Sequence, residues 1–103
     1  MLLVREVFHC KPGQVRALVD KFRKMSDIGE KMGMPRMRIL TDVAGAEYWT
    51  LVAEMEVEDL AAFEKLMPGP QMNPDDMKAF ESAMSGYHDL VDHGRREIYR
   101  IES

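Results

Sequence analysis

Residues 2–19 read LLVREVFHCKPGQVRALV, and the periodicity of their apolar side chains changes in the middle. Residues 2–9 are rich in β-branched and aromatic types, with apolar side chains at both odd and even positions. That pattern is typical of a strand whose two faces are both covered. Pro12 suits the first turn of a helix, because the N–H that it lacks is not needed there. The stretch therefore predicts a strand, a turn and a helix in direct succession.

The predicted helix is amphipathic and ends near Gly33. Charged residues fill most positions on one side, and apolar residues recur at helical spacing on the other. The apolar positions are Val15, Leu18, Val19, Phe22, Met25 and Met32. Gly33 followed by Pro35 is typical of a helix C-terminus.

Two more strands are expected at residues 36–42 and 48–57. The short loop around Gly45 between them predicts a hairpin, so these strands should be antiparallel neighbours. Within residues 48–57 the alternating positions that share one face are Trp49, Leu51, Ala53, Met55 and Val57. The pattern is typical of a strand with one continuous apolar face.

The second half of the chain contains a helical region that is broken in two. Residues 58–67 predict a short helix, which residues 67–77, MPGPQMNPDDM, interrupt with their prolines and glycine. The interrupting segment could be a lid over a pocket or an inert connector between the two helical pieces.

A longer helix is expected to begin after Asn73 and to end near Gly94. Asn73 is expected to be its N-cap, with Pro74 at the first helical position and acidic residues in the first turn. The apolar residues that this helix should bury are Met77, Phe80, Met84, Tyr87 and Val91. Residues 95–101 then predict a last strand.

The order of elements is β-α-β-β-α-β, which is the ferredoxin-like arrangement of the α+β class. We expect one domain over residues 1–103, with a four-stranded antiparallel sheet and its helices on one face. The first strand carries apolar residues on both faces. A second subunit, packed sheet against sheet into an α+β barrel, is the simplest cover for the other face.

The composition limits the kinds of partner and compartment that we expect for the protein. The 14 lysines and arginines are outnumbered by 18 acidic residues, so nucleic acid is not an expected partner. No apolar run approaches the length of a membrane span, and Arg5 and Glu6 interrupt any signal-peptide core. Cys10 is the only cysteine, so no intrachain disulfide can form. We expect a cytoplasmic protein with no cofactor.

Residues 4–22, VREVFHCKPGQVRALVDKF, and residues 94–101, GRREIYRI, resemble the dimeric α+β-barrel superfamily. The likeness is greatest to its NIPSNAP-like and antibiotic-biosynthesis-monooxygenase-like branches, where an Arg-Glu pair on the first strand runs into a Lys-Pro-Gly helix start. It implies a homodimer with a pocket between sheet and helices. Its members include cofactor-independent monooxygenases and proteins without known activity. The haem-degrading branch fits poorly, because Met84 stands near the position of its helical histidine.

His88 is expected on the apolar face of the second long helix. It could be a general base, since a histidine titrates near neutral pH, or a structural histidine hydrogen-bonded to backbone. His93 lies five residues on and would not share that helical face, so we expect no metal site. His9 and Cys10 are adjacent on a strand and point to opposite faces, so they are not a nucleophile–base pair.

Four further residues are candidate walls of a ligand pocket, namely Trp49, Met55, Met84 and Tyr87. Trp49 could stack on a planar ligand, and the methionines could adapt to its shape. The predicted function is a homodimeric small-molecule-binding domain, in its most concrete form a cofactor-independent monooxygenase with an apolar or aromatic substrate. The alternative is a non-catalytic dimeric binding or interaction module. An exposed His88 would remove the only expected base from the first hypothesis.

Three arginines lie on predicted strands, where packing does not need a long cation. They could neutralise an acidic ligand, or they could pair with glutamates on neighbouring strands, which is the expected arrangement. The arginines are Arg5, Arg38 and Arg96, and the glutamates are Glu6, Glu54 and Glu97.

Overall fold

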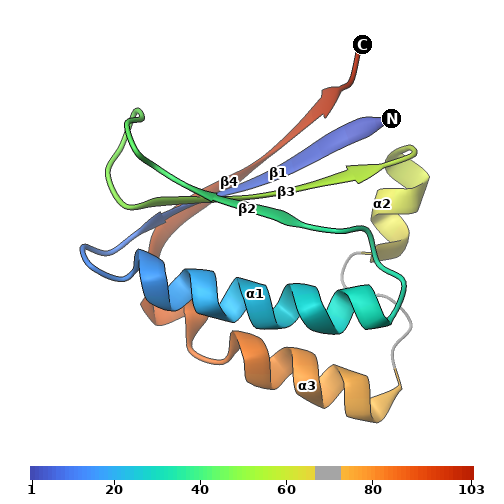
Figure 1. Cartoon of the computed structure of the whole chain (residues 1–103), viewed down its shortest axis with the longest axis horizontal. Helices are drawn as coiled ribbons and strands as arrows, with labels where there is room; N and C mark the ends of the chain where they lie inside the picture. The colour runs from blue at the N-terminus through green and yellow to red at the C-terminus, as the bar shows by residue number, and fades with distance from the viewer. Residues whose placement is uncertain (67–72) are drawn as a thin grey trace.

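Four strands form one antiparallel sheet in the spatial order β2-β3-β1-β4 (Figure 1). The computed structural model describes residues 1–66 and 73–103. Along the chain the elements are β1 (Leu2–Cys10), α1 (Val15–Lys31), β2 (Arg38–Thr41), β3 (Thr50–Val57), α2 (Leu60–Leu66), α3 (Pro74–Met84), a 3-10 turn η1 (Tyr87–Asp89) and β4 (Val91–Arg100). This is the predicted ferredoxin-like α+β fold, with α2 and α3 as the two pieces of the second helical region.

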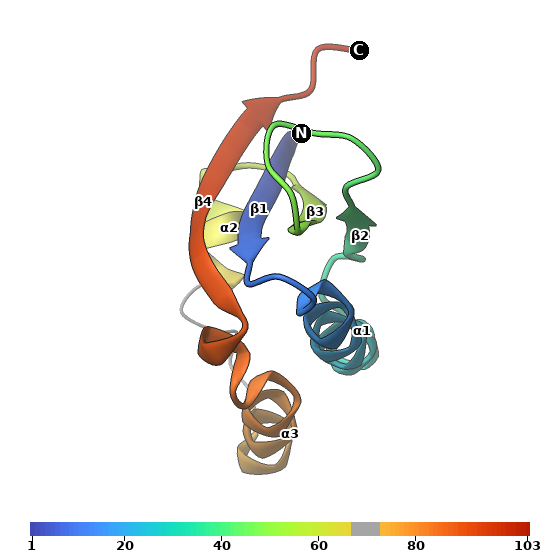
Figure 2. The same ribbon diagram turned by 90° about the vertical axis from the view of Figure 1, so that its left-hand side faces the viewer.

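The described helices all lie on one side of the sheet. Figures 1 and 2 show α1 directly against the strands and α3 beyond it, where α3 packs mainly on α1. Leu18, Val19 and Phe22 of α1 form the main core with Leu51 and Ala53 of β3, and these side chains are almost completely buried. A membrane-crossing helix would need more length and more apolar character than any described helix has.

The pairing of β1 decides which residues face the helices. Val4 lies opposite Met55 of β3 and Ile98 of β4, whereas Arg5 lies opposite Glu54 and Glu97. Directly opposed residues project to the same side of a sheet, so these two sets point in opposite directions. We call the side away from the helices the open face. From the paired positions it carries Leu3, Arg5, Val7, His9, Arg38, Leu40, Thr50, Val52, Glu54, Glu56, His93, Arg95, Glu97 and Tyr99.

The β2–β3 connection, residues 42–49, curls toward the open face (Figure 1). Asp42 Oδ1 accepts a hydrogen bond from the N–H of Thr50 at 2.8 Å, which closes the connection at its base. Trp49 has a φ of 59°, a left-handed conformation that a strand does not allow. The expectation that Trp49 belongs to the third strand is therefore wrong, since β3 begins at Thr50.

In the last third of the chain, the long helix ends earlier than predicted. Asn73 caps α3 as expected, and its side-chain oxygen accepts the N–H of Asp76 at 2.8 Å. However, α3 ends at Met84 rather than near Gly94, because Gly86 takes a left-handed φ of 79° and η1 follows. Most of the predicted lid, residues 67–72, lies outside the described residues.

Gly94 lies inside β4, opposite Phe8 of β1, instead of ending a helix. A Cβ atom at this position would lie 2.9 Å from the carbonyl oxygen of Val7 and 3.2 Å from the ring of Phe8. Both distances are shorter than comfortable van der Waals contact. The glycine therefore permits the close approach of β4 to β1.

Replacing Gly94 with alanine should lower the free energy of unfolding by about 1–3 kcal/mol, because backbone of the central strand must move to admit the methyl group. Urea unfolding followed by circular dichroism measures this loss. Gly45→Ala is the matched control, since the nearest atom to its added Cβ is 3.9 Å away. Equal stabilities of the two variants would contradict the close-approach argument.

Candidate functional site

A groove of about 1170 Å³ runs between α1 and the β2 side of the sheet and is open to solvent. Pockets for small molecules typically enclose roughly 300–1,000 Å³, so this groove has room for such a ligand. It extends from Arg16 near the start of α1 to Arg36 in the segment that leads into β2. Its place, between helix and sheet, is where the sequence analysis expects a pocket.

The groove exists because β2 is short. β2 pairs with β3 only from Thr41 opposite Leu51 to Arg38 opposite Glu54. The remaining part of β3, residues 55–57, has no described strand partner on that side. The groove lining includes Met55, which faces the helices, and Glu56, which lies on the open face. The groove therefore wraps around this exposed edge of the sheet.

The groove lining combines an apolar floor with charged walls. The apolar lining residues are Met1, Leu3, Val19, Met37, Ile39, Met55 and Ile101. The charged ones are Arg16, Arg23, Arg36, Arg38, Asp27, Glu30, Glu54 and Glu56. Such a lining suits a ligand with an apolar body and a charged group.

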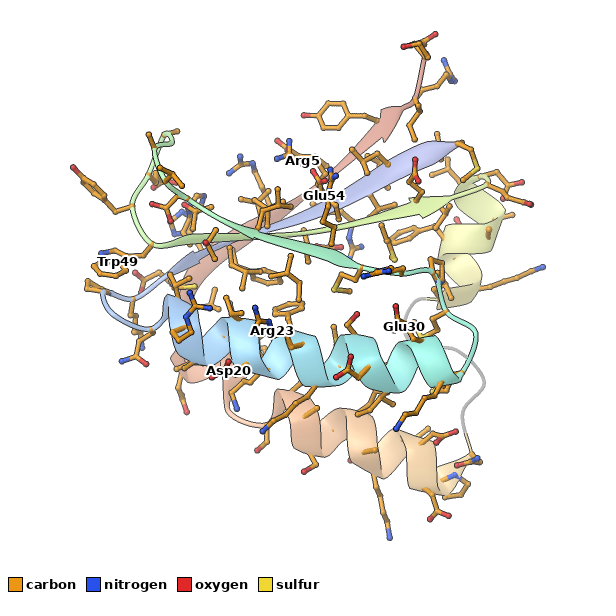
Figure 3. The ribbon with its side chains drawn as sticks, viewed as in Figure 1. Arg5, Asp20, Arg23, Glu30, Trp49 and Glu54 are labelled. Carbon is orange, nitrogen blue, oxygen red and sulfur yellow. The ribbon has the colours of Figure 1, made fainter. Side chains whose placement is uncertain are left out.

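Two of the groove arginines are engaged in ion pairs and two are not. Arg38 Nη2 lies 2.7 Å from Glu54 Oε1, and Arg36 Nε lies 3.7 Å from Glu30 Oε1. Arg16 and Arg23 have no ion pair within 4 Å among the described residues. They lie two turns apart on α1, and both line the groove. Figure 3 shows Arg23 on the side of α1 that borders the sheet. These two cations are available to an anionic group of a ligand.

An ion-pair network occupies the centre of the open face. Glu54 Oε2 lies 2.9 Å from Arg5 Nε, and its other carboxylate oxygen contacts Arg38 (Figure 3). Arg5 Nη1 also lies 3.5 Å from Glu97 Oε1. The Glu54 side chain is only 9% exposed, so this carboxylate depends on its two guanidinium partners. The predicted cross-strand pairing of these arginines is confirmed, as it is for Arg96, which pairs with Glu6.

The residues predicted to line one pocket do not come together. Met55 alone lines the groove, whereas Met84 and Tyr87 pack against the core at the end of α3. Trp49 is 43% exposed and lies beside the turn that precedes α1 (Figure 3). Neither described cavity includes Trp49, Met84, Tyr87 or His88.

His88 is exposed on η1, and its ring packs on that of Tyr87 with centroids 3.9 Å apart. The expectation that it lies on the apolar face of a helix is wrong, because α3 ends at Met84. A general base must reach the proton that it removes, and neither described cavity borders this ring. The catalytic role of His88 therefore stays a prediction.

Two features of the groove and the core refine the sequence analysis. Arg16 and Arg23 fall on the charged side of the amphipathic helix, to which the sequence analysis assigns no ligand. Their seven-residue spacing was the available signal that they share one helical face. Cys10 is buried in the core, and burial, followed by the nearby carboxylates of Asp92 and Asp42, raises the pKa of its thiol. A thiol with a raised pKa is a poor nucleophile, which agrees with a packing role.

Comparison with solved structures supports the architecture. An uncharacterized NIPSNAP-like domain protein from Burkholderia xenovorans is 12% identical with a TM-score of 0.75, over 99% of this chain and 85% of that chain. A NIPSNAP domain protein from the same organism is 15% identical with a TM-score of 0.70, over 100% and 96%. An antibiotic biosynthesis monooxygenase is 13% identical with a TM-score of 0.68, over 100% of both chains. The chain shares their fold.

These neighbours represent both branches that the sequence resembles. No protein-family model and no curated protein matches the chain. At 12–15% identity the likeness shows the fold and does not carry over an activity.

Glu54→Gln should lower the free energy of unfolding by about 1–3 kcal/mol, because it leaves two arginines without their shared carboxylate in a largely buried position. Chemical denaturation measures the loss. Glu56→Gln is the control, since this exposed residue on the same strand and face has no ion pair among the described residues. A loss of equal size in both variants would show that the network contributes no stability.

Proposed function

We propose that the protein is a homodimeric small-molecule-binding domain whose ligand has an apolar or aromatic body and an anionic group. The single observation that carries this proposal is the groove along α1, where two arginines that form no ion pair with residues 1–66 or 73–103 lie beside apolar side chains. An apolar or aromatic body of the ligand is predicted from the sequence. The anionic group is inferred from Arg16 and Arg23.

The groove supplies both kinds of contact. Ile39 and Met55 offer apolar surface, and the flexible methionine adapts to ligand shape. Arg23 is one helical turn from Val19, so a ligand lying on the apolar floor would have its anionic end within reach of the guanidinium. Guanidinium groups bind carboxylates through two parallel hydrogen bonds, which favours a carboxylate or a similar planar anion.

The open face supports a dimer. A contact across a two-fold axis must be complementary to itself, so a charged surface can form one only when it carries charges of both signs. The open face has such a balance, with Arg5, Arg38 and Arg95 beside Glu54, Glu56 and Glu97. It also carries exposed apolar surface at Leu40 and Tyr99. Because the groove reaches this face at Glu56, a second subunit would border its open side.

A cofactor-independent monooxygenase is the second candidate, favoured by the solved antibiotic biosynthesis monooxygenase that shares the fold. His88, the base that this candidate was expected to use, is exposed on η1 rather than on the apolar face of a helix. Binding without catalysis therefore accounts for the described geometry with fewer assumptions. His88→Ala separates the two, since only the catalytic hypothesis with His88 as base requires the variant to lose turnover.

Anilinonaphthalene sulfonate, a fluorescent probe with a planar apolar body and one anionic group, should bind the folded protein. Arg23→Ala should weaken this binding by at least about tenfold, because it removes a charge-assisted contact. Lys24→Ala is the matched control, since it removes the same charge from the adjacent α1 position outside the groove lining. Fluorescence titration measures both affinities, and equal weakening would contradict a specific anion contact.

Sedimentation velocity at micromolar concentration should give a mass of twice the 11.9 kDa chain. Leu40→Asp places a charge on the open face and should shift the protein toward the monomer. Leu60→Asp is the control, because Leu60 is also exposed but lies on α2, on the helix side of the sheet. A wild-type monomer, or dissociation by both variants, would overturn the proposed sheet-to-sheet dimer.

A further inference from the structure

Three potential metal ligands from three separate segments meet on the open face. His9 lies one residue before the end of β1, His93 lies opposite it on β4, and Glu47 reaches them from the β2–β3 connection. The ligand atoms of all three lie within 4.8 Å of one another. His9 Nε2 is 2.8 Å and His93 Nε2 is 3.6 Å from Glu47 Oε2. We propose that this cluster binds a divalent first-row transition metal ion such as Zn²⁺.

The hydrogen bonds of His9 prepare its ring for this role. The His9 side chain is 8% exposed, and its Nδ1 lies 3.2 Å from Thr50 Oγ1. The Thr50 hydroxyl donates its own hydrogen to the carbonyl oxygen of Glu47 at 3.0 Å, so toward His9 it can only accept. Nδ1 is therefore the donor in this bond, and Nε2, the nitrogen that would bind a metal ion, lies beside the Glu47 carboxylate. Outer hydrogen bonds of this kind orient metal-binding histidines in known sites.

His9 Nε2 and Glu47 Oε2 lie 2.8 Å apart, close enough for both atoms to bind one cation. In a tetrahedral zinc site with bonds of roughly 2.0–2.1 Å, neighbouring ligand atoms are about 3.3 Å apart. The two observed separations, 2.8 and 3.6 Å, lie on either side of that value. Small side-chain movements would bring all three atoms into the coordination sphere of one ion.

Arg95 is the cation beside the cluster in this structure. Its Nη1 lies 3.0 Å from His9 Nε2, and its Nε lies 3.1 Å from Glu97 Oε2. A metal ion bound to His9 Nε2 would repel the Arg95 guanidinium. The metal ion and Arg95 would therefore compete for this nitrogen. The Arg95 side chain is 54% exposed and already pairs with Glu97. It can therefore move away from His9 when a metal ion binds and keep its bond to Glu97.

The ligand set defines the class of metal. Two imidazoles and one carboxylate suit zinc and its neighbours, whereas Ca²⁺ and Mg²⁺ prefer oxygen ligands alone. Three protein ligands leave room for water, and a cavity of about 250 Å³ borders the site between the connection and the sheet. All three ligands come from one chain, so one subunit is sufficient to form the site. The site lies on the open face, where the proposed dimer would bring the partner subunit close to it.

Isothermal titration calorimetry of zinc chloride into the full chain, free of any histidine tag, tests the site. We expect one ion per chain with a dissociation constant below about 100 µM. Glu47→Gln and His93→Asn should each weaken binding at least about tenfold, because each removes a ligand. Both side chains are at least half exposed, so their replacement should spare the fold. His88→Asn is the matched control, an exposed histidine outside the cluster, and should leave the affinity unchanged.

Two further variants separate metal binding from a merely structural role. Arg95→Gln should tighten zinc binding, because it removes the competing cation. Thr50→Val should weaken it by about tenfold without removing a ligand, because Nδ1 loses its acceptor. Cobalt(II) in place of zinc should give the visible absorption of a tetrahedral site, and His93→Asn should abolish it. A dissociation constant above about 100 µM, or equal affinities for the His93, Glu47 and His88 variants, would overturn the proposal.

Discussion

The alternation of side chains along β1 sets the chemistry of both faces of the sheet. This strand lies between β3 and β4, so its register fixes which residues of both neighbours share its two sides. Val4 is buried toward the helices, whereas Arg5 enters the ion-pair network on the open face. A slip of one residue would turn charges into the core and apolar side chains toward solvent. Core, network and histidine cluster all depend on this register.

The open face gathers its polar groups into two distinct arrangements. At its centre, Glu54 is shared by two arginines on neighbouring strands. Toward the end of β1, His9 and His93 both lie near one carboxylate oxygen of Glu47. The first arrangement pairs charges of opposite sign, whereas the second gathers the three groups that we propose as ligands of a metal ion.

The order of the helices and strands could be predicted from the sequence, but the end of α3 could not. Alternation at Leu51, Ala53 and Val57 and helical spacing at Leu18 and Phe22 are strong local patterns, and the structure buries these residues as predicted. The helix was extended too far because Tyr87 and Val91 happen to continue its spacing. The left-handed backbone of Gly86, a local conformational choice, ends the helix regardless of that spacing.

The candidate sites were harder to predict, because each depends on distant segments. His9 and His93 meet only through the β1–β4 pairing, and the sequence does not state which strands are neighbours. The groove depends on where β2 stops, and a strand boundary is among the least certain features of a sequence pattern. Of the predicted pocket residues only Met55 borders the groove, since the others were placed by the assumed length of a helix or strand.

The short β2 that opens the groove also leaves backbone N–H and C=O groups of β3 without a strand partner at residues 55–57. Such an exposed edge is a template for pairing with other chains, and natural proteins protect edges with charge and proline. Glu56 places a carboxylate at this edge, and Pro35 lies among the residues that line the same gap. The edge along which the groove opens is therefore also where the protein must be protected against aggregation.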